Sequence, residues 1–164
     1  MRFGILTVSD RSSRGERPDR SGPALKEKIL AEGWQVLQDD IVPDDILILK
    51  DNLARWADGR EFDVILTTGG TGFAPRDVTP EATQAVIQRS APGLVEAMRA
   101  ESLKITPHAM LSRSIAGIRD RTLIVNLPGS PKAALENLNV IIPVLPHAVE
   151  LLHEDARAEA GHQF

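Results

Sequence analysis

Hydrophobic and polar positions along this chain predict strands and helices in alternation. Compact apolar runs, typical of strands buried in a sheet, occupy residues 3–8, 34–42, 62–68 and 122–127. Apolar residues recur at helical spacing in the stretches 21–33, 44–57, 79–89, 92–105 and 131–154. Ser21, Asp44, Thr79 and Ser130 stand where four of these helices begin, and we expect them at the helix N-termini. Residues 109–117 are expected to form a loop or a short strand.

This alternation predicts one α/β domain, built as a three-layer sandwich with a mostly parallel central sheet and helices on both faces. The expected domain covers residues 1–154. The last ten residues, 155–164, hold little apolar surface and are expected to fray. Ligands of such folds bind outside the carboxyl ends of the strands, so the functional residues are sought there.

Composition narrows the function classes. Hydrophobic residues make up 42% and charged residues 26% of the chain, which is ordinary for a globular protein. The net charge of −4 argues against nucleic acid as a partner, and only 4% of residues are aromatic, too few for a base-stacking platform. Cysteine is absent, which excludes disulfides and thiolate chemistry. No secretory signal and no apolar run of about 20 residues is recognised, so we expect a cytoplasmic protein without membrane contact.

The glycine-rich stretch 67–72 carries the strongest local signal for ligand binding. It follows a predicted strand and leads to a predicted helix with Thr79 at its start and Pro80 in its first turn. Such a turn exposes backbone N–H groups near the positive end of a helix dipole, which favours anions. The alternative is a turn that only closes a strand–helix corner. Neither the ATPase P-loop spacing nor G-x-G-x-x-G is present.

Three loops leave the carboxyl ends of predicted strands, and we expect one shared site built from them. The candidate ligand-binding residues on these loops are Ser9, Asp10, Gly69, Gly70, Thr71, Gly72, Asn126, Pro128, Gly129 and Ser130. Asn126 could contact a ligand edge or brace the turn. The arginines at 11, 14, 17 and 20 form either a solvated loop or an anion-guiding mouth.

Asp44 and Asp77 are the candidate catalytic residues and metal ligands. Each follows a turn that contains proline, near a predicted helix N-terminus. Helix capping is the alternative, more so for Asp44, because Thr79 already serves as the cap beside Asp77. Two carboxylates would repel a phosphate unless a hard cation such as Mg²⁺ lay between them. The pair therefore indicates metal-assisted phosphoryl or nucleotidyl transfer.

A second polar loop contains Ser112, Arg113 and Ser114. Its hydroxyl groups and guanidinium could hold a phosphate or the edge of a heterocycle. An ordinary surface loop is the competing interpretation.

Taken together, the motifs resemble those of the molybdopterin adenylyltransferase family, over residues 3–153 in the same order and spacing. The matching segments are VSDR at 8–11, PDRSGP at 18–23, VPD at 42–44, TTGGTG at 67–72, PRDVTPEA at 75–82, PGL at 92–94, SLKITPHAMLSRS at 102–114, AGIR at 116–119 and NLPGSPKA at 126–133. Each motif is weak alone, whereas the ordered set is highly specific.

The resemblance implies an enzyme whose substrates are ATP and molybdopterin, a pyranopterin dithiolene with a terminal phosphate. It implies that this phosphate attacks the α-phosphate of ATP with the help of Mg²⁺, giving adenylyl-molybdopterin and pyrophosphate. The family's two functional aspartates fall on Asp44 and Asp77, and its ligand loops on 67–72, 112–114 and 126–131. The resemblance also implies a homotrimer that hands its product to a molybdate-inserting enzyme.

Two other function classes remain. A binding module of the same fold would hold molybdopterin or its adenylate and deliver it without catalysis, but it gains nothing from two bare carboxylates. A nucleotide-dependent oxidoreductase is disfavoured because G-x-G-x-x-G is absent. For the trimer interface, the best local candidate is the stretch 102–114, with an interior loop as the alternative.

Overall fold

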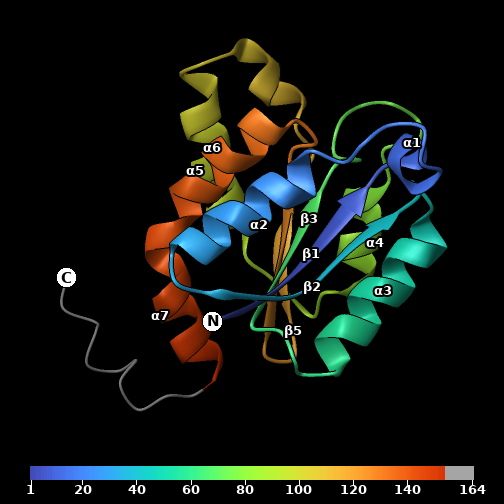
Figure 1. Ribbon diagram of the computed structural model, residues 1–164. Coiled ribbons are helices and arrows are strands. Elements are labelled where there is room, and N and C mark those ends of the chain that lie inside the picture. The colour runs from blue at the N-terminus through green and yellow to red at the C-terminus, as the bar shows by residue number, and fades with distance from the viewer. Residues whose placement is uncertain (154–164) are drawn as a thin grey trace.

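A six-stranded sheet forms the centre of the protein in the computed structural model, which describes residues 1–153 (Figure 1). The strands are β1 (Arg2–Val8), β2 (Gln35–Val42), β3 (Val64–Thr68), β4 (Arg89–Ser90), β5 (Ala116–Arg119) and β6 (Thr122–Leu127). Their order across the sheet is β2-β1-β3-β6-β5-β4. Strands β2, β1, β3 and β6 are parallel, and β5 runs antiparallel to both β6 and β4. The predicted mostly parallel sheet is therefore confirmed.

Helices cover both faces of this sheet, which confirms the predicted three-layer sandwich (Figure 1). The helices are α1 (Asp10–Ser13), α2 (Ser21–Ala31), α3 (Ile46–Asp58), α4 (Thr79–Val86), α5 (Pro92–Leu103), α6 (Pro131–Ile141) and α7 (Leu145–Leu152), with 3₁₀ turns at η1 (Pro107–Leu111) and η2 (Ile142–Val144). Helices α2, α5, α6 and α7 pack on one face, and α3 and α4 on the other. Alternate strand residues serve the two layers, since Ile5 packs with the first set and Leu6 with the second.

Three of the expected helix starts are wrong by one residue, and the differences matter for the site. Helix α3 is capped by Asp45, whose carboxylate accepts the N–H groups of Leu47 and Ile48 at 2.9 and 3.1 Å. Asp44 therefore does not cap α3. Ser21 lies inside α2, and the carboxylate of Asp19 accepts the free N–H groups at that end instead.

Thr79 also differs from expectation, because it lies inside α4 and its hydroxyl donates to the carbonyl of Gly69 at 2.9 Å. This bond ties the glycine loop to the helix that follows. Ser130 caps α6 as predicted, accepting the N–H of Ala133 at 3.2 Å.

The predicted helix 79–89 ends early, at Val86, and residues 89–90 form strand β4 instead. The chain turns extended at Ile87, and Gln88 N–H donates to the carbonyl of Ile118 at 2.8 Å. Pairing with β5 thus overrides the helical pattern. Residues 109–117, expected as loop or short strand, contribute to both η1 and β5.

The helical segment Pro131–Leu152 is long and apolar enough, by length and composition, to cross a membrane, with a mean hydropathy of 1.2 over its best window. Lys132, Glu136 and Glu150 interrupt the segment, so it is not the uninterrupted apolar run that the sequence analysis looked for. The segment is broken by η2, near the predicted interruption at Pro143, and its residues Ala134, Leu138, Ile141, Leu145 and Val149 are buried in the core against the sheet. Core helices of globular proteins pass the same test. The predicted frayed tail, 155–164, lies outside the described residues.

Candidate functional site

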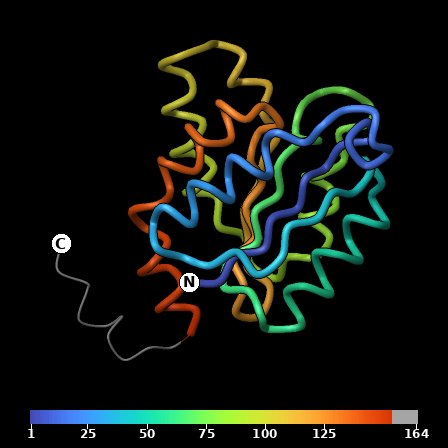
Figure 2. The backbone as a smooth tube through the Cα atoms, in the orientation of Figure 1, coloured from blue at the N-terminus to red at the C-terminus, as the bar shows by residue number. Residues whose placement is uncertain are grey.

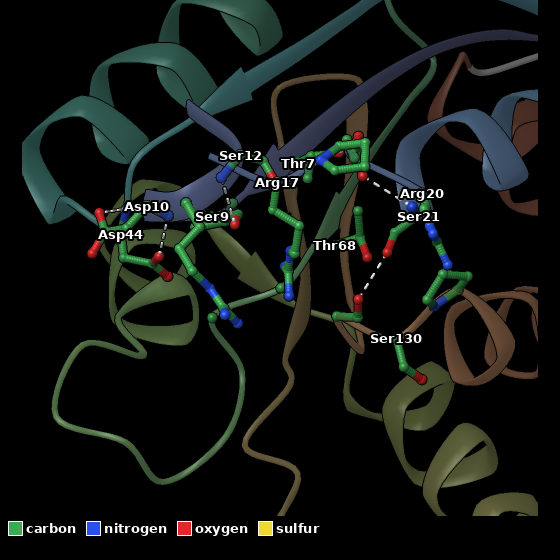
Figure 3. A pocket seen from close by; sticks show the side chains of 18 of the residues that line it. Thr7, Ser9, Asp10, Ser12, Arg17, Arg20, Ser21, Asp44, Thr68 and Ser130 are labelled. Carbon is green, nitrogen blue, oxygen red and sulfur yellow. Dashed lines mark hydrogen bonds between the residues drawn. The ribbon is translucent and has the colours of Figure 1, made fainter. Parts of the chain in front are cut away.

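Loops from three strands meet at the carboxyl edge of the sheet, as expected from the parallel arrangement of β1, β3 and β6 (Figure 2). They enclose a cleft of about 800 Å³ whose lining is rich in charged and hydroxyl side chains, here called the polar cleft (Figure 3). The residues that line it are Thr7, Val8, Ser9, Asp10, Arg11, Ser12, Arg17, Pro18, Asp19, Arg20, Ser21, Asp44, Thr68, Gly69, Gly70, Asp77, Gly129, Ser130 and Pro131.

One end of the polar cleft is acidic because of the register of β1 and β2. Val8 pairs with Val42, so the residues that follow these two strands are neighbours, and Ser9 N–H donates to the carbonyl of Val42 at 2.9 Å. Asp10 and Asp44 then bond reciprocally: each backbone N–H donates to the other's carboxylate, at 2.8 and 3.1 Å. The two acidic side chains are thereby fixed side by side (Figure 3).

The segment before α4 adds a third carboxylate and one cation. Arg76 reaches across to Asp10 and makes three hydrogen bonds with its carboxylate, at 2.7 to 3.0 Å. The carboxylate of Asp77 accepts the N–H of Ala74 at 2.9 Å, which folds this segment back onto the cleft. Within residues 1–153, Arg76 thus neutralises Asp10, whereas no cation forms an ion pair with Asp44 or Asp77.

Burial raises the pKa of Asp44 above its ordinary value, and the charges of Asp10 and Asp77 raise it further, against the N–H bond from Asp10. A divalent cation between Asp44 and Asp77 would relieve this repulsion. No group of three or more His, Cys, Asp or Glu side chains able to hold a metal is found among the described residues. The two carboxylates therefore suit Mg²⁺, which commonly takes one or two carboxylates and completes its shell with substrate phosphates and water.

The glycine loop, residues 69–72, requires glycine for reasons inside the protein. Gly69 and Gly70 have φ values of +105° and +63°, which other residues rarely adopt. A Cβ on Gly69 would lie 2.3 Å from the carbonyl oxygen of Val8. A Cβ on Gly70 would lie 2.4 Å from Thr79 Oγ1 and 3.1 Å from Asp44 Oδ1. The loop can therefore approach both the sheet and the acidic pair only without side chains.

A second, mainly apolar cleft of about 300 Å³ lies on the other side of the glycine loop; it is here called the apolar cleft. Its lining residues are Thr71, Gly72, Val95, Met98, Arg99, Ser102, Ile105, Thr106, His108, Ala109, Leu111, Ser112, Ser114, Pro128, Ala133, Glu136 and Asn137. Most of the lining surface is apolar, and some of the polar groups are held in place: Asn137 donates to the hydroxyl of Ser102 at 3.1 Å, and the hydroxyls of Ser112 and Ser114 lie 3.1 Å apart.

Two predicted ligand residues line neither cleft. Asn126 is fully buried, and its side-chain amide bonds the hydroxyls of Thr67 and Thr83, both at 2.9 Å, and the N–H of Ile115 at 3.2 Å. Of the two roles considered for it, bracing the turn fits this geometry.

The guanidinium of Arg113 is likewise bonded to groups of the protein itself. It donates to the carbonyls of Gly72 and Asp77 and forms an ion pair with Glu81. Its geometry ties the glycine loop to α4, and contact with a ligand stays a prediction.

The remaining candidates divide between the two clefts. Ser9, Asp10, Asp44, Gly69, Gly70, Asp77, Gly129 and Ser130 line the polar cleft, and Thr71, Gly72, Ser112, Ser114 and Pro128 line the apolar cleft. Sequence reasoning did not anticipate two clefts. It also missed Asp19, which accepts the hydroxyl of Thr7 at 2.7 Å, and Ser102 and Asn137, polar residues within otherwise helical patterns.

Comparison with known proteins places the chain in a family. The family described as "Probable molybdopterin binding domain" matches residues 4–147. The molybdopterin adenylyltransferase of Helicobacter pylori is 43% identical over 152 residues, covering 92% of this chain and 86% of that protein. Gephyrin of Dictyostelium discoideum is 46% identical over 165 residues, and there this chain matches 94% of its own length but 23% of gephyrin.

Comparison with solved structures leads to the same family. The molybdopterin biosynthesis enzyme MoaB of Thermus thermophilus has a TM-score of 0.88 and 51% identity to this chain, with 94% of this chain and 97% of that chain covered. With a family match over residues 4–147 and relatives of this similarity, the chain belongs to the molybdopterin-binding domain family that its motifs resembled.

Proposed function

We propose that this protein transfers the adenylyl group of ATP to the terminal phosphate of molybdopterin, releasing pyrophosphate, in molybdenum cofactor biosynthesis. Relatives named molybdopterin adenylyltransferase support a role in that pathway and a nucleotidyltransferase activity. The observation that carries the proposal is the seam between the clefts: a polar and an apolar cleft adjoin at the glycine loop, with Asp44 and Asp77 beside it.

The polar cleft suits a nucleoside triphosphate. Its lining combines glycine backbone, hydroxyl groups and arginines, which bind phosphate oxygens, with a carboxylate pair that fits a metal-bound polyphosphate. Gly69 and Gly70 present bare backbone at its floor. We assign ATP to this cleft.

The apolar cleft suits the pterin. Flat heterocycles bind where apolar walls cover their faces and a few fixed polar groups meet their edges. Val95 and Met98 supply buried apolar surface, and Ser102, Ser112 and Asn137 supply hydroxyl and amide groups. The terminal phosphate of the pterin would then point to Gly72, toward the polar cleft.

The reaction that follows is an in-line displacement. A terminal phosphate oxygen of molybdopterin forms a bond to the α-phosphorus of ATP, and the bond from that phosphorus to the α,β-bridging oxygen breaks. The electron pair of the broken bond leaves on pyrophosphate. The role of this chain is to hold both phosphates at the glycine loop in reacting order, which removes much of the entropic barrier.

Asp44 and Asp77 would hold Mg²⁺. When bound, the ion supplies neutralisation of phosphate charge at the reacting centre. Arg76 and Asp10 contribute by fixing Asp44: the Arg76–Asp10 pair and the reciprocal Asp10–Asp44 bonds leave that side chain little freedom.

The second candidate function is non-catalytic binding and delivery of molybdopterin within the same fold. It would need the apolar cleft but not two uncompensated carboxylates, one of them with a raised pKa. Two such carboxylates lower the stability of the fold, and a role as metal ligands would explain why they are present. We therefore favour the enzyme.

We further propose that the protein is a homotrimer that passes its product to a molybdate-inserting enzyme. The predicted interface, 102–114, carries apolar side chains at the surface: Ile105 is 60% and Met110 is 64% exposed. These exposures argue against the interior loop considered as the alternative. Light scattering coupled to gel filtration should give about three times the chain mass of 17.9 kDa at low micromolar concentration. A monomer over that range would contradict the trimer.

The test of the function is direct. The protein is incubated with molybdopterin, ATP and Mg²⁺ under anaerobic conditions, and the products are identified by mass spectrometry. Adenylyl-molybdopterin and pyrophosphate in equal amounts are expected. If molybdopterin binds but no adenylate forms, the delivery function is the correct one.

A further inference from the structure

The polar cleft separates its charges. Figure 3 shows Asp10 and Asp44 at one end, Arg20 with Ser21 and Ser130 at the other, and the Arg17 side chain between them. The metal-binding carboxylates can therefore serve only one end of a bound polyphosphate. At the opposite end of the cleft, other side chains must neutralise the negative charge of the polyphosphate.

Arg17 and Arg20 line the polar cleft and have no carboxylate partner within residues 1–153. Six others pair with acidic side chains; these are Arg2 with Asp63, Arg14 with Glu16, Arg60 with Asp120, Arg76 with Asp10, Arg113 with Glu81, and Arg119 with Asp58. Arg11 also lines the cleft, but its charge is partly met by Glu16.

The carboxylate that lies between these two arginines in the sequence, that of Asp19, is already hydrogen-bonded. Asp19 accepts the hydroxyl of Thr7 at 2.7 Å and the backbone N–H groups of Ser21 and Gly22 at 2.9 and 3.2 Å. Its oxygens are held by the start of α2 and the end of β1. Two guanidinium groups that face a cleft and form no ion pair within residues 1–153 leave their forked donors for an anionic ligand.

We propose that Arg17 and Arg20 form the site of the β- and γ-phosphates of ATP, and hence of the pyrophosphate leaving group. The assignment rests on the proposed function for its biological ligand, while the site itself is defined by its affinity for pyrophosphate. As the bond from the α-phosphorus to the bridging oxygen breaks, negative charge grows on that oxygen. Cations beyond the bridging oxygen stabilise that charge, whereas the carboxylate end cannot do so by itself.

The test measures binding of inorganic pyrophosphate by isothermal titration calorimetry, with Mg²⁺ present, so that no transferase activity is needed. The double variant Arg17→Gln/Arg20→Gln is compared with the wild type. Arg14→Gln is the matched control, because Arg14 lies in the same segment, carries the same charge, pairs with Glu16 and does not line the cleft. Thermal melting of each variant establishes that it is folded.

The double variant should lose about tenfold or more in affinity for pyrophosphate, and Arg14→Gln should bind like the wild type. Equal affinity in the double variant and the wild type would overturn the proposal, as would absence of pyrophosphate binding by the wild type. An equal loss in the double variant and in Arg14→Gln would also overturn it, since a general field of positive charge would then explain the binding. Should no adenylate form in the product assay while the pyrophosphate result holds, only the proposed function fails.

Discussion

The two clefts that adjoin at the glycine loop are opposite in chemistry, and their difference explains how one small domain could handle two unlike substrates. The polar cleft is large and held by charged hydrogen bonds between loops, such as the pair of Arg76 and Asp10. The apolar cleft is smaller and lies between α5, η1 and α6, where Met98 is part of the hydrophobic core. The polar cleft is suited to bind charged phosphates, and the apolar cleft is suited to enclose a flat ring. Variants can therefore be chosen that damage one cleft and leave the other intact.

The largest effect is expected from the carboxylates of the polar cleft. Asp77→Asn and Asp44→Asn should each lower adenylyl transfer by on the order of 10² or more, because an amide keeps the shape but is a poor Mg²⁺ ligand. Molybdopterin binding, measured by calorimetry, should change far less than turnover. Near-normal turnover in both variants would refute the roles assigned to the two aspartates.

Filling the apolar cleft should have the converse effect. Ala109 lines that cleft, and Ala109→Phe should weaken molybdopterin binding by about tenfold or more through steric exclusion, with ATP binding retained. Ala100→Phe is the matched control, since Ala100 is exposed on α5 and lines neither cleft. A joint loss of ATP and pterin binding in Ala109→Phe would argue that the clefts are not separate sites.

Substitutions in the glycine loop, where the two clefts adjoin, are expected to lower the stability of the protein as well as its function. Gly70→Ala should lower the free energy of unfolding by about 1–3 kcal/mol, because its Cβ meets Thr79 and Asp44 at a positive φ. Gly93→Ala, where a Cβ meets nothing within 4 Å, should change stability by less than about 1 kcal/mol. Urea titration measures both. The result would be contradicted by equal stability of the two variants.

This geometry changes what a substitution at Gly70 can report. A larger side chain, as in Gly70→Val, cannot block a ligand here without also weakening the fold. The atoms that it would meet first belong to Thr79, Asp44 and Val8, so fold and ligand site must suffer together.

The smallest expected effect is a change in melting temperature, because the carboxylate of Asp44 lowers the stability of the fold when it is charged. The folded-state pKa of Asp44 lies above its ordinary value of 3.8, mainly because of burial, so the native state holds this proton more tightly than the unfolded state. Stability from this group is therefore present at low pH and lost as the pH rises through the folded-state value. With EDTA present, Asp44→Asn should melt above the wild type at neutral pH, and the difference should vanish below about pH 3.8. A lower melting temperature for the variant at neutral pH would contradict this sign.

How far the sequence predicted the molecule depended on whether a signal was local. Compact apolar runs located β1, β3 and β6, and helical spacing located α5, to within two residues at each end. The short strand β4 was missed because it exists only through pairing with β5, distant in sequence. The cap of α3 was misassigned because Asp44 and Asp45 are both plausible caps, and only the bond from Asp10 separates them.

The candidate site shows the same limit. Strand-end loops and glycines indicated where a ligand binds, since parallel strands end at one edge. Nothing local revealed that the glycine loop divides two clefts, that Arg113 turns inward to hold this loop, or that Asn126 is buried between Thr67 and Thr83. The apolar cleft exists because α5, η1 and α6 come together beside Thr71 and Gly72, and a linear pattern does not encode such contacts.

The most direct test of the two-cleft account is hydrogen–deuterium exchange measured by mass spectrometry, with each ligand added alone. With α,β-methylene-ATP, which cannot release pyrophosphate, we expect protection in 9–20 and 43–45. With molybdopterin, protection should fall in 98–114 instead. Both ligands should protect 69–72, the loop between the clefts. Protection of the same outer segments by both ligands, or no protection of the glycine loop by either, would contradict the account.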